Sequence, residues 1–411
     1  MKRIVKEIKQ NKKQTNNNKK KTVCFILPKG FPVPNVKGGA IETLITNLIE
    51  KNEQEKRIKI TVVSLYDKEA YKRSLDYKMC NFIYVKKDII YYFYTLKVRI
   101  HNLFCKEKYN TYNEYILSKI KKCYFNLVIV EDGNYFCFKH YLKFFEKKKM
   151  VLHMHHDGIS NSSLGYTYDK FIGISDYVVN KFKNNSNIKQ YYKLMNGIDL
   201  NKFKKEITSS EKTELRKKYG FTNKDFIVLF CGRIIKEKGI LELVQAINEI
   251  KNENIKLLIV GSVNFSKSVM TQFEINLREI INQGNKIKLT GYIKNEELYK
   301  YYKIADIQVV PSILEEAAGL VAIEGMISGL PLIVTNSGGM IEYVSKDTIV
   351  VEKKINLVEN LKTEIMHLYN DKMLMNKMIR SGVKTAKGFG KTAFYNNFCS
   401  IVENMVGDNS E

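Results

Sequence analysis

The sequence predicts an α/β protein made of two domains, each a doubly wound parallel sheet covered by helices, with a cleft between them. Short apolar runs, typical of buried parallel strands, alternate with segments of helical periodicity in both halves of the chain. Between the halves, Asn201 to Lys217 is charged and poor in bulky apolar residues. At 411 residues the chain is long enough for two domains of ordinary size.

The first domain is expected over residues 22–203. It follows a basic tail, residues 1–21, which is rich in Lys, Asn and Gln and is predicted to be disordered. A helix is expected over Ile41 to Ile49, after the loop Pro28 to Gly39. The region between Lys68 and Phe125 is predicted to be mostly helical. The predicted strands are Val23 to Leu27, Lys59 to Leu65, Leu127 to Val130, Met150 to Met154 and Lys170 to Ile174.

The second domain is expected over residues 204–391. A final segment, residues 392–411, is predicted to be helical over Thr392 to Met405. Helices are expected between successive strands of the second domain, as in any parallel sheet. The predicted strands are Phe226 to Cys231, Lys256 to Val260, Lys286 to Thr290, Ile307 to Val310, Pro331 to Val334 and Thr348 to Val351.

The composition favours a reduced, cytoplasmic protein that is attracted to polyanions. The formal net charge is +25, so nucleic acid, an anionic membrane surface and phosphate-bearing substrates all qualify as partners. The seven cysteines include no C-x-x-C pair, so neither a disulfide framework nor a zinc site is expected. No apolar run approaches the ~20 residues of a spanning helix, and the sequence shows no signal peptide.

The segment Ala305 to Val344 carries the strongest functional signal. An apolar strand ends at Pro311-Ser312, Glu316 follows in a loop, and a short helix that begins near Gly319 contains Glu324. Parallel sheets bind ligands at the carboxyl ends of their strands, and a helix amino terminus suits a phosphate. The two glutamates can therefore reach opposite ends of one elongated ligand. The alternative is one acid that favours the helix start and a second, solvated acid.

A pair of cations follows an earlier strand of the same domain. Gly232-Arg233 ends the strand Phe226 to Cys231, and Lys238-Gly239 precedes a helix that starts near Ile240. Two cations at the carboxyl end of a strand, opposite a helix amino terminus, can hold a diphosphate. The alternative is a solvated basic loop in a lysine-rich protein.

The first domain offers a glycine pair and a histidine cluster. Gly38-Gly39 lies in the first strand-to-helix loop and permits close backbone approach to a ligand, although turns use such pairs commonly. His153, His155 and His156 end a predicted strand, and alternation places His153 and His155 on one face. His-x-His can ligate a metal. No third ligand is evident at motif spacing, so no metal site is predicted.

These motifs together resemble the retaining glycosyltransferases of family 4, glycosyl transferases group 1, which have the GT-B fold. The resemblance rests on Glu316 and Glu324 with seven residues between them, on the Gly-Arg…Lys-Gly pair and on Asn196-Gly197-Ile198-Asp199. It implies two Rossmann-like domains, the first for the acceptor and the second for the nucleotide-sugar donor, with a final helix that returns to the first domain. The implied reaction is glycosyl transfer from a nucleotide-diphosphate sugar to an acceptor hydroxyl, with retained configuration.

The same resemblance implies the substrates. Neither a metal nor another cofactor is expected, and a UDP-sugar is the first expectation for the donor. The acceptor would be a saccharide or a lipid-linked saccharide in cell-surface polysaccharide or glycolipid assembly. The residues Ala317 and Ala318 depart from the family, in which an aromatic residue or a proline is common near these positions, so the shape of the sugar pocket is open.

A role for each site residue is also implied. Glu316 would hold sugar hydroxyls and Glu324 the ribose, while Arg233 and Lys238 would neutralise the departing diphosphate. His155, or His156 in second place, would contact the donor sugar near its six position. Further contacts with the donor are implied for a set of mostly glycine and backbone positions: Gly38, Gly39, Gly261, Tyr292, Ile293, Gly319, Leu320 and Val321.

Other functions stay open at this point. A GT-B-fold sugar-nucleotide epimerase is expected to lack the combination of both motifs, and a phosphorylase is expected to carry a lysine-bound pyridoxal phosphate. A non-enzymatic basic protein that binds a polyanion such as nucleic acid fits the charge. It predicts clustered basic and aromatic motifs, however, which the sequence does not show. Nucleic acid is therefore not expected as a partner.

The run Lys86 to Lys108 has basic ends around an aromatic and aliphatic helix that also contains Lys97 and Arg99. This pattern suits the headgroup layer of an anionic membrane, which would make the protein peripheral at the inner face of the cell membrane. The alternative is a helix that packs on the first domain's sheet with Tyr and Lys at its rim.

Overall fold

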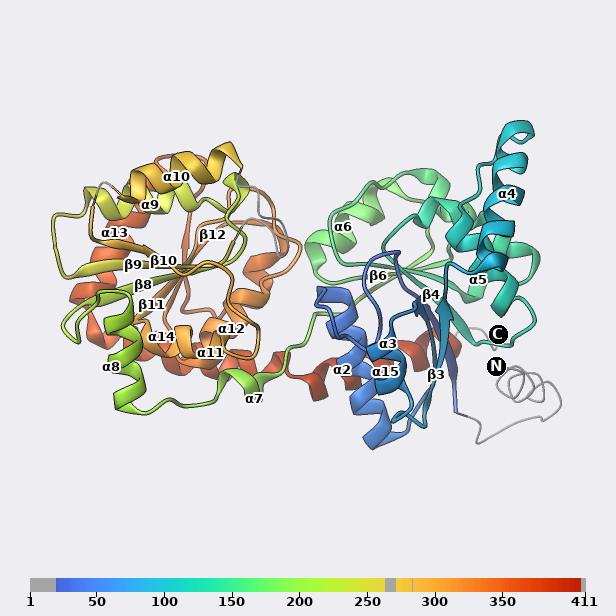
Figure 1. The fold of residues 1–411 in the computed structure, drawn as a ribbon, viewed down its shortest axis with the longest axis horizontal. Coiled ribbons are helices and arrows are strands. Elements are labelled where there is room, and N and C mark those ends of the chain that lie inside the picture. The colour runs from blue at the N-terminus through green and yellow to red at the C-terminus, as the bar shows by residue number, and fades with distance from the viewer. Residues whose placement is uncertain (1–19, 263–270, 283, 408–411) are drawn as a thin grey trace. The chain divides into compact units, whose positions relative to one another are not determined.

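The computed structural model describes residues 20–262, 271–282 and 284–407, and the chain divides into two compact units (Figure 1). The first unit comprises Met1–Gly197 together with Lys391–Glu411, and the second comprises Ile198–Gly390. Of the basic tail expected over residues 1–21, only Lys20 and Lys21 lie within the described residues. Each unit contains one parallel sheet with helices on both faces, which confirms the predicted α/β class.

The first unit has a seven-stranded parallel sheet in the order β3-β2-β1-β4-β5-β6-β7. Two strands were not predicted. β3 lies inside the region expected to be mostly helical, and β7 contains only polar and aromatic residues because it forms a half-exposed edge. The strands are β1 (Thr22–Ile26), β2 (Lys59–Leu65), β3 (Cys80–Val85), β4 (Leu127–Glu131), β5 (Met150–Met154), β6 (Lys170–Gly173) and β7 (Gln190–Lys193).

Helices connect these strands, and side chains cap several of them. Asp88, for example, accepts a hydrogen bond from the Tyr91 amide and so starts α4, and Asn110 caps α5 in the same way. The helices are α2 (Ala40–Glu55), α3 (Lys68–Ser74), α4 (Ile89–Phe104), α5 (Thr111–Ile120), α6 (Asp176–Asn185), α15 (Lys391–Gly407) and the 3₁₀ segments η2 (Tyr135–Lys143), η3 (Lys147–Lys149) and η4 (Ser162–Tyr166).

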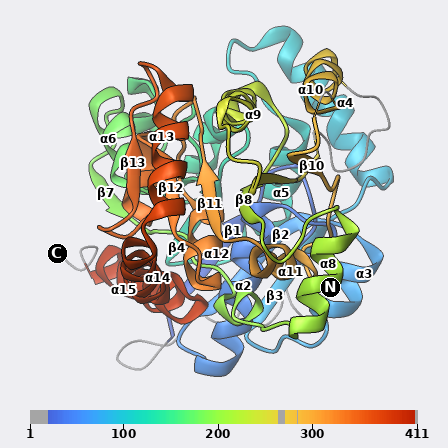
Figure 2. The same ribbon diagram turned by 90° about the vertical axis from the view of Figure 1, so that its left-hand side faces the viewer.

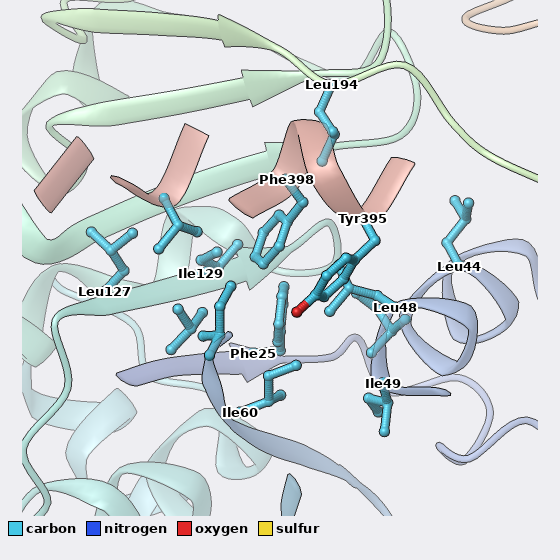
Figure 3. Close-up of a cluster of buried hydrophobic side chains, with 14 of the residues drawn as sticks. Phe25, Leu44, Leu48, Ile49, Ile60, Leu127, Ile129, Leu194, Tyr395 and Phe398 are labelled. Carbon is cyan, nitrogen blue, oxygen red and sulfur yellow. The ribbon is translucent and has the colours of Figure 1, made fainter. Parts of the chain in front are cut away.

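The final helix α15 packs in the core of the first unit, which confirms the predicted return of the chain (Figure 3). Phe398 of α15 lies 5.5 Å from the ring of Phe25 in β1, between centroids, and both side chains are buried. The Tyr395 hydroxyl donates a hydrogen bond of 2.8 Å to Asn52 of α2. Removing a buried Phe side chain such as Phe398 costs about 3–5 kcal/mol, so α15 is an integral part of this unit.

The second unit has a six-stranded parallel sheet in the order β10-β9-β8-β11-β12-β13, seen in Figure 2 with β13 at one side and β10 at the other. All six strands lie at the predicted places. Their apolar runs are nearly continuous because helices bury both faces of the sheet. The strands are β8 (Phe226–Cys231), β9 (Ile255–Val260), β10 (Ile287–Leu289), β11 (Ile307–Val310), β12 (Leu332–Thr335) and β13 (Ile349–Val351).

The helices of the second unit alternate with its strands, as the sequence predicted. They are α7 (Leu200–Phe203), α8 (Ser209–Lys218), α9 (Ile240–Glu249), α10 (Gln272–Asn282), α11 (Leu298–Ile304), α12 (Leu320–Ser328), α13 (Leu357–Asn370), α14 (Lys372–Ala386) and the 3₁₀ segments η5 (Lys236–Lys238), η6 (Gly338–Tyr343) and η7 (Lys387–Phe389). Within the part of the chain that the structure describes, no helix combines the length and apolarity needed to span a bilayer.

The strand order of each sheet locates its ligand site. In the first unit the chain leaves β1 in one direction and returns to β4 on the other side, and in the second unit β8 and β11 are related in the same way. Ligands of doubly wound sheets bind at such a switch point, outside the carboxyl ends of the two strands. The predicted site residues follow β1 and β5 in the first unit and β8, β9, β10 and β11 in the second, so they lie at these two places or at the ends of neighbouring strands.

Candidate active site

In the second unit, Lys238 and Glu316 form an ion pair at the carboxyl ends of β8 and β11. The Lys238 Nζ lies 2.5 Å from the Glu316 Oε1, and both side chains are about a quarter exposed or less, at 27% and 20%. The Ser312 hydroxyl donates a hydrogen bond to the same carboxylate oxygen. The sequence assigned the two charged residues to different parts of the donor, and the structure brings them into direct contact.

The close approach of two loops explains this contact. Gly239 has a positive φ of 67°, and a Cβ at this position would lie 1.9 Å from the carbonyl oxygen of Pro311. A larger residue at position 239 would therefore push η5, and Lys238 with it, away from the end of β11. Arg233, the second predicted cation, precedes this turn and is exposed.

The backbone of Glu316 is held by the loop after β12, which belongs to the segment Ala305 to Val344 but for which the sequence predicted no contact with Glu316. The Glu316 amide donates a hydrogen bond of 3.1 Å to the Ser337 hydroxyl, which in turn donates to the Leu314 carbonyl. The amide of Gly339 donates to the Glu316 carbonyl at 2.6 Å. Glu316 is therefore fixed from two sides, by Ser312 at its carboxylate and by the loop after β12 at its backbone.

The helix that follows, α12, begins as predicted, with Leu320 as its first residue and Gly319 before it. Among the described residues, no side chain caps this amino terminus. The first-turn amides, which include those of Leu320 and Val321, and the positive end of the helix dipole therefore suit the phosphate predicted for this position.

Glu324 lies on the same helix in a largely enclosed setting. Its carboxylate accepts a hydrogen bond of 2.8 Å from the buried Tyr302 hydroxyl of α11. Burial raises the pKa of Glu324 from 4.5 to about 7, although the Tyr302 hydrogen bond and the nearby Lys202 ammonium act in the opposite direction. Burial also lowers the pKa of Lys202, against the attraction of Glu324. Tyr302 and Lys202 were missed because they come from other helices.

The remaining predicted residues of this unit lie at adjoining strand ends. Gly261 pairs with Gly291 in an isolated bridge, with a hydrogen bond of 3.2 Å between the Gly261 amide and the Gly291 carbonyl. A Cβ at Gly261 would lie 1.8 Å from the Gly232 carbonyl oxygen, so the ends of β8, β9 and β10 meet. Tyr292 is 53% exposed and Ile293 is half-buried beside it.

In the first unit, the predicted glycine loop carries a buried acid. The Glu42 carboxylate lies directly over the loop, so that a Cβ at Gly39 would lie 2.1 Å from the Glu42 Oε2. The Phe31 amide donates to the same carboxylate at 3.3 Å, and burial raises the pKa of Glu42. Gly38 and Gly39 both have positive φ, of 88° and 101°, which only glycine adopts readily. Gly39 therefore makes room for Glu42, whereas Gly38 is required only by its backbone conformation.

The histidine cluster closes around Glu131, a residue that sequence reasoning missed. Strand pairing places Glu131 beside His153, and the His155 Nε2 lies 2.6 Å from the Glu131 Oε2. The His153 Nδ1 lies 3.1 Å from the Glu131 Oε1, and the two imidazole centroids are 4.1 Å apart, which confirms the predicted alternation. His156 is on the other side, with its side chain 54% exposed. The sequence does offer one indication of Glu131, because this glutamate directly follows the apolar run of β4 and so stands at the carboxyl end of a strand.

The charges in this cluster are unequal. Burial would raise the pKa of Glu131, but the two histidines hold it at about 2. Burial lowers the pKa of His153. For His155 burial acts the same way, but the hydrogen bond and charge of Glu131 outweigh it and raise the pKa. The cluster is therefore an ionised Glu131 with a readily protonated His155. The His155 Nδ1 is buried without a hydrogen-bond partner among the described residues.

The same three residues could also be considered as ligands of a metal ion. The sequence showed no third ligand beside His153 and His155, and the fold supplies one in Glu131, with the candidate ligand atoms within 4.8 Å of one another. The 2.6 Å between His155 and Glu131 is the length of a direct charge-assisted hydrogen bond. We therefore interpret the cluster as hydrogen-bonded.

A cavity of about 200 Å³ lies beside this cluster, between the ends of β1 and β4 and the start of α5. Its lining includes both carboxylates of the β4 end, Glu131 and Asp132, and the side chains of Lys29, Asn110 and Asn113. The lining also includes apolar side chains such as Leu27, Val130 and Phe138. A hollow that mixes hydrogen-bonding and apolar groups can contact both the hydroxyls and the carbon face of a sugar.

Comparisons with known proteins concern the family and the fold of the chain. Residues 211–385 match the sequence model of the family described as glycosyl transferases group 1. The putative glycosyltransferase YtcC of Bacillus subtilis is 26% identical over 382 residues, which cover 88% of this chain and 86% of that protein. The capsular polysaccharide biosynthesis glycosyltransferase CapM of Staphylococcus aureus is 29% identical over 194 residues, 46% of this chain and 47% of that protein.

Among solved structures, Anabaena Alr3699/HepE in complex with UDP-glucose superposes with a TM-score of 0.70 at 15% identity, over 93% of this chain and 99% of that one. At this identity the likeness concerns the fold, two Rossmann-like parallel sheets of the GT-B type. The chain thus has the GT-B fold, and residues 211–385 of its second unit match the glycosyl transferases group 1 model.

Proposed function

We propose that the protein is a retaining, metal-independent glycosyltransferase that moves a sugar from a nucleoside-diphosphate sugar to an acceptor hydroxyl in polysaccharide or glycolipid assembly. The observation that carries the proposal is the Lys238–Glu316 ion pair beside the uncapped start of α12, at the switch point of a group 1 domain. A UDP-sugar is the first candidate for the donor, since the Alr3699/HepE neighbour was solved with UDP-glucose.

The ion pair can exchange its partners when a donor binds. Without ligand, Glu316 neutralises Lys238 at 2.5 Å. A donor offers a diphosphate oxygen to Lys238 and sugar hydroxyls to Glu316, so both charges keep a partner while the sugar enters. Ser312 and Ser337 hold Glu316 in place through this exchange. The donor thereby completes a site that is already oriented, which lowers the entropic cost of binding.

Catalysis then depends on the charge that grows on the leaving diphosphate. Lys238 and the amino terminus of α12 are preorganised positive groups, and the exposed Arg233 adds a further cation. Such groups are worth most where charge develops in the transition state. They also replace the divalent ion that other phosphate-transferring sites use for this purpose. For the retained configuration we propose a front-face route, in which the leaving phosphate takes the proton of the acceptor hydroxyl.

The remaining groups orient the donor. Glu324 accepts hydrogen bonds from the ribose hydroxyls, and it does so best as a carboxylate. Burial and the pKa of about 7 therefore make nucleotide binding depend on pH in the neutral range. The protonated His155, held by Glu131, donates to the sugar. The acceptor is a saccharide or a lipid-linked saccharide, and the hydrogen-bonding side chains in the lining of the cavity beside Glu131 and Asp132 suit its hydroxyls.

A donor screen tests the proposal. The thermal unfolding temperature would be measured against UDP-, GDP- and ADP-sugars, and the product of the stabilising donor would be analysed by NMR for its anomeric configuration. We expect one nucleotide class to stabilise the protein, and transfer that retains the configuration and survives EDTA. An inverted product would overturn the retaining assignment, and an absolute need for Mg²⁺ or Mn²⁺ would overturn the phosphate-clamp assignment.

A further inference from the structure

Helix α4 exposes an apolar face that nothing in the first unit covers within the described residues. Eight large apolar or aromatic side chains of this helix are between 47% and 85% exposed, whereas only Tyr91 and Val98 are buried. Figure 1 shows α4 at the margin of its unit, beside α5. Contiguous apolar exposure on this scale marks an interaction site. The sequence left open whether this helix packs on the sheet, and the structure shows that it packs on α5 instead.

The helix is nevertheless held firmly in the fold. Tyr91 and Tyr94 pack on Tyr115 of α5, with ring centroids 5.5 and 5.9 Å apart. At its carboxyl end, His101 stacks on Tyr109 at 3.9 Å, and the Asn102 side chain exchanges hydrogen bonds with the backbone of Tyr109. The exposed face is therefore presented by a fixed helix, and substitutions on it should leave the fold intact.

The pattern on the exposed face is regular. Ile89, Phe93, Leu96, Ile100 and Leu103 recur at alternating spacings of four and three residues and form one strip along the outer side of the helix. At 3.6 residues per turn, the exposed cations Lys97 and Arg99 lie about 80° to either side of this strip. The strip runs from Ile89 to Leu103, so at 1.5 Å per residue it is about 21 Å long.

Charge decides which partner fits this strip. The four-three spacing is also that of a coiled-coil seam, for which a second copy of the chain would be the partner. The positions beside such a seam normally hold opposite charges, but here they hold Lys97 and Arg99, and the helix has no acidic residue. Two copies would therefore bring cations together, and two heptads are short for a coiled coil. An anionic surface satisfies the same cations, and the basic residues around the helix, such as Lys86 and Lys108, add to the attraction.

We propose that the outer face of α4 docks on a membrane surface that is rich in anionic lipid, with the apolar strip among the acyl chains and the flanking cations at the headgroups. A helix of this kind lies in the plane of the interface, and its binding weakens with salt because part of it is electrostatic. If the proposed function also holds, the acceptor is lipid-linked and is reached by an enzyme that is already bound to the membrane.

Cosedimentation of the full chain with lipid vesicles tests this docking. Vesicles of phosphatidylcholine with about a quarter phosphatidylglycerol would be compared with pure phosphatidylcholine, at about 0.1 M and about 0.5 M salt. Lys97→Glu with Arg99→Glu tests the cations, and Leu96→Gln with Ile100→Gln tests the strip with a residue that keeps the helix. The matched control is Lys217→Glu with Lys218→Glu, two exposed cations on α8.

We expect the wild type to bind the anionic vesicles, and each α4 variant to lose at least about tenfold in binding while the α8 control changes by less than about twofold. Binding that is indifferent to lipid charge, or that survives both α4 variants, would overturn the proposal. A wild type that forms a dimer, breaks up on Leu96→Gln with Ile100→Gln and ignores vesicles would show that a second copy covers the strip.

The two proposals fail separately. UDP binding, measured by calorimetry without vesicles, involves residues of the second unit and should be the same in the α4 variants as in the wild type. Loss of vesicle binding with intact UDP binding would leave the glycosyltransferase proposal standing. Vesicle binding without any response to nucleoside-diphosphate sugars would leave the membrane proposal standing and overturn the enzymatic one.

Discussion

If Lys238 and Glu316 exchange partners when a donor binds, substitutions at the two positions should change UDP affinity in different directions. Lys238→Ala removes the cation that would hold the donor diphosphate, so UDP affinity should fall. Glu316→Gln removes the carboxylate that competes for Lys238 in the free protein, so UDP affinity should stay the same or rise. Two residues in one ion pair of 2.5 Å should thus act on nucleotide affinity in different ways.

The magnitudes separate this prediction from a purely structural role. The pair is partly exposed, and exposed or half-exposed pairs contribute about 1 kcal/mol or less to the free energy of unfolding. Loss of a preorganised donor to a developing anion costs about 3–4 kcal/mol in the transition state, or roughly a hundredfold to a thousandfold in rate. Lys238→Ala should therefore change the unfolding temperature little and the transfer rate greatly.

The assay is calorimetric titration with UDP, combined with kcat for the donor that the screen identifies. Lys236→Ala is the matched control, since Lys236 is an exposed cation of the same 3₁₀ segment, and it should change neither quantity by more than about twofold. The reasoning would be refuted if Lys238→Ala left UDP affinity unchanged, or if it lowered stability by several kcal/mol and activity only in proportion.

Two further predictions concern pH. Because burial raises the pKa of Glu324 from 4.5 to about 7, UDP affinity of the wild type should increase as the pH rises through 7, and Glu324→Gln should bind UDP weakly at every pH. The same raised pKa means that the stability this carboxyl contributes is lost as the pH rises from 4.5 to about 7. The free energy of unfolding of the wild type should therefore fall relative to that of Glu324→Gln over this window. An equal dependence of the two free energies on pH would contradict the assignment. Glu131→Gln removes the charge that raises the pKa of His155, so NMR should show the His155 ring titrating at lower pH. The stability that protonated His155 contributes is present below 6.5 and is lost as the pH rises through its raised pKa, and an unchanged His155 titration in Glu131→Gln would show that the carboxylate does not control it.

The fold was largely predictable because its central strands are buried on both faces. Strands such as β1 and β8 are almost purely apolar runs, because burial on both faces requires apolar residues at nearly every position. The missed strands lack such a continuous apolar run. β7 is a half-exposed edge, and β3 mixes Asn and Tyr with apolar residues, so its pairing with β2 depends on a neighbour that the local sequence does not reveal.

In the candidate site too, residues that are close together in the sequence were predictable, and contacts between distant segments were not. Glu316, the start of α12 and Glu324 belong to one short segment, and Arg233 and Lys238 to another, so local spacing together with the family resemblance predicted each group. Their supports were not predictable in this way. Ser337 reaches Glu316 from the next strand, and the Tyr302 hydroxyl reaches Glu324 from α11. Such contacts depend on strand order and helix packing.

The sequence by itself determined the chemistry that each unit can offer: two glutamates at a helix start, cations at a strand end, histidines on one face of a strand, and an apolar helix with basic flanks. Only the tertiary structure decided which charges meet. It paired Lys238 with Glu316 and placed Glu131 between His153 and His155, and it buried Glu324 deeply enough to raise its pKa to about 7. The physical reason is that a side chain's charge and hydrogen bonding are set by neighbours that are distant in sequence, and parallel sheets join residues that many intervening positions separate.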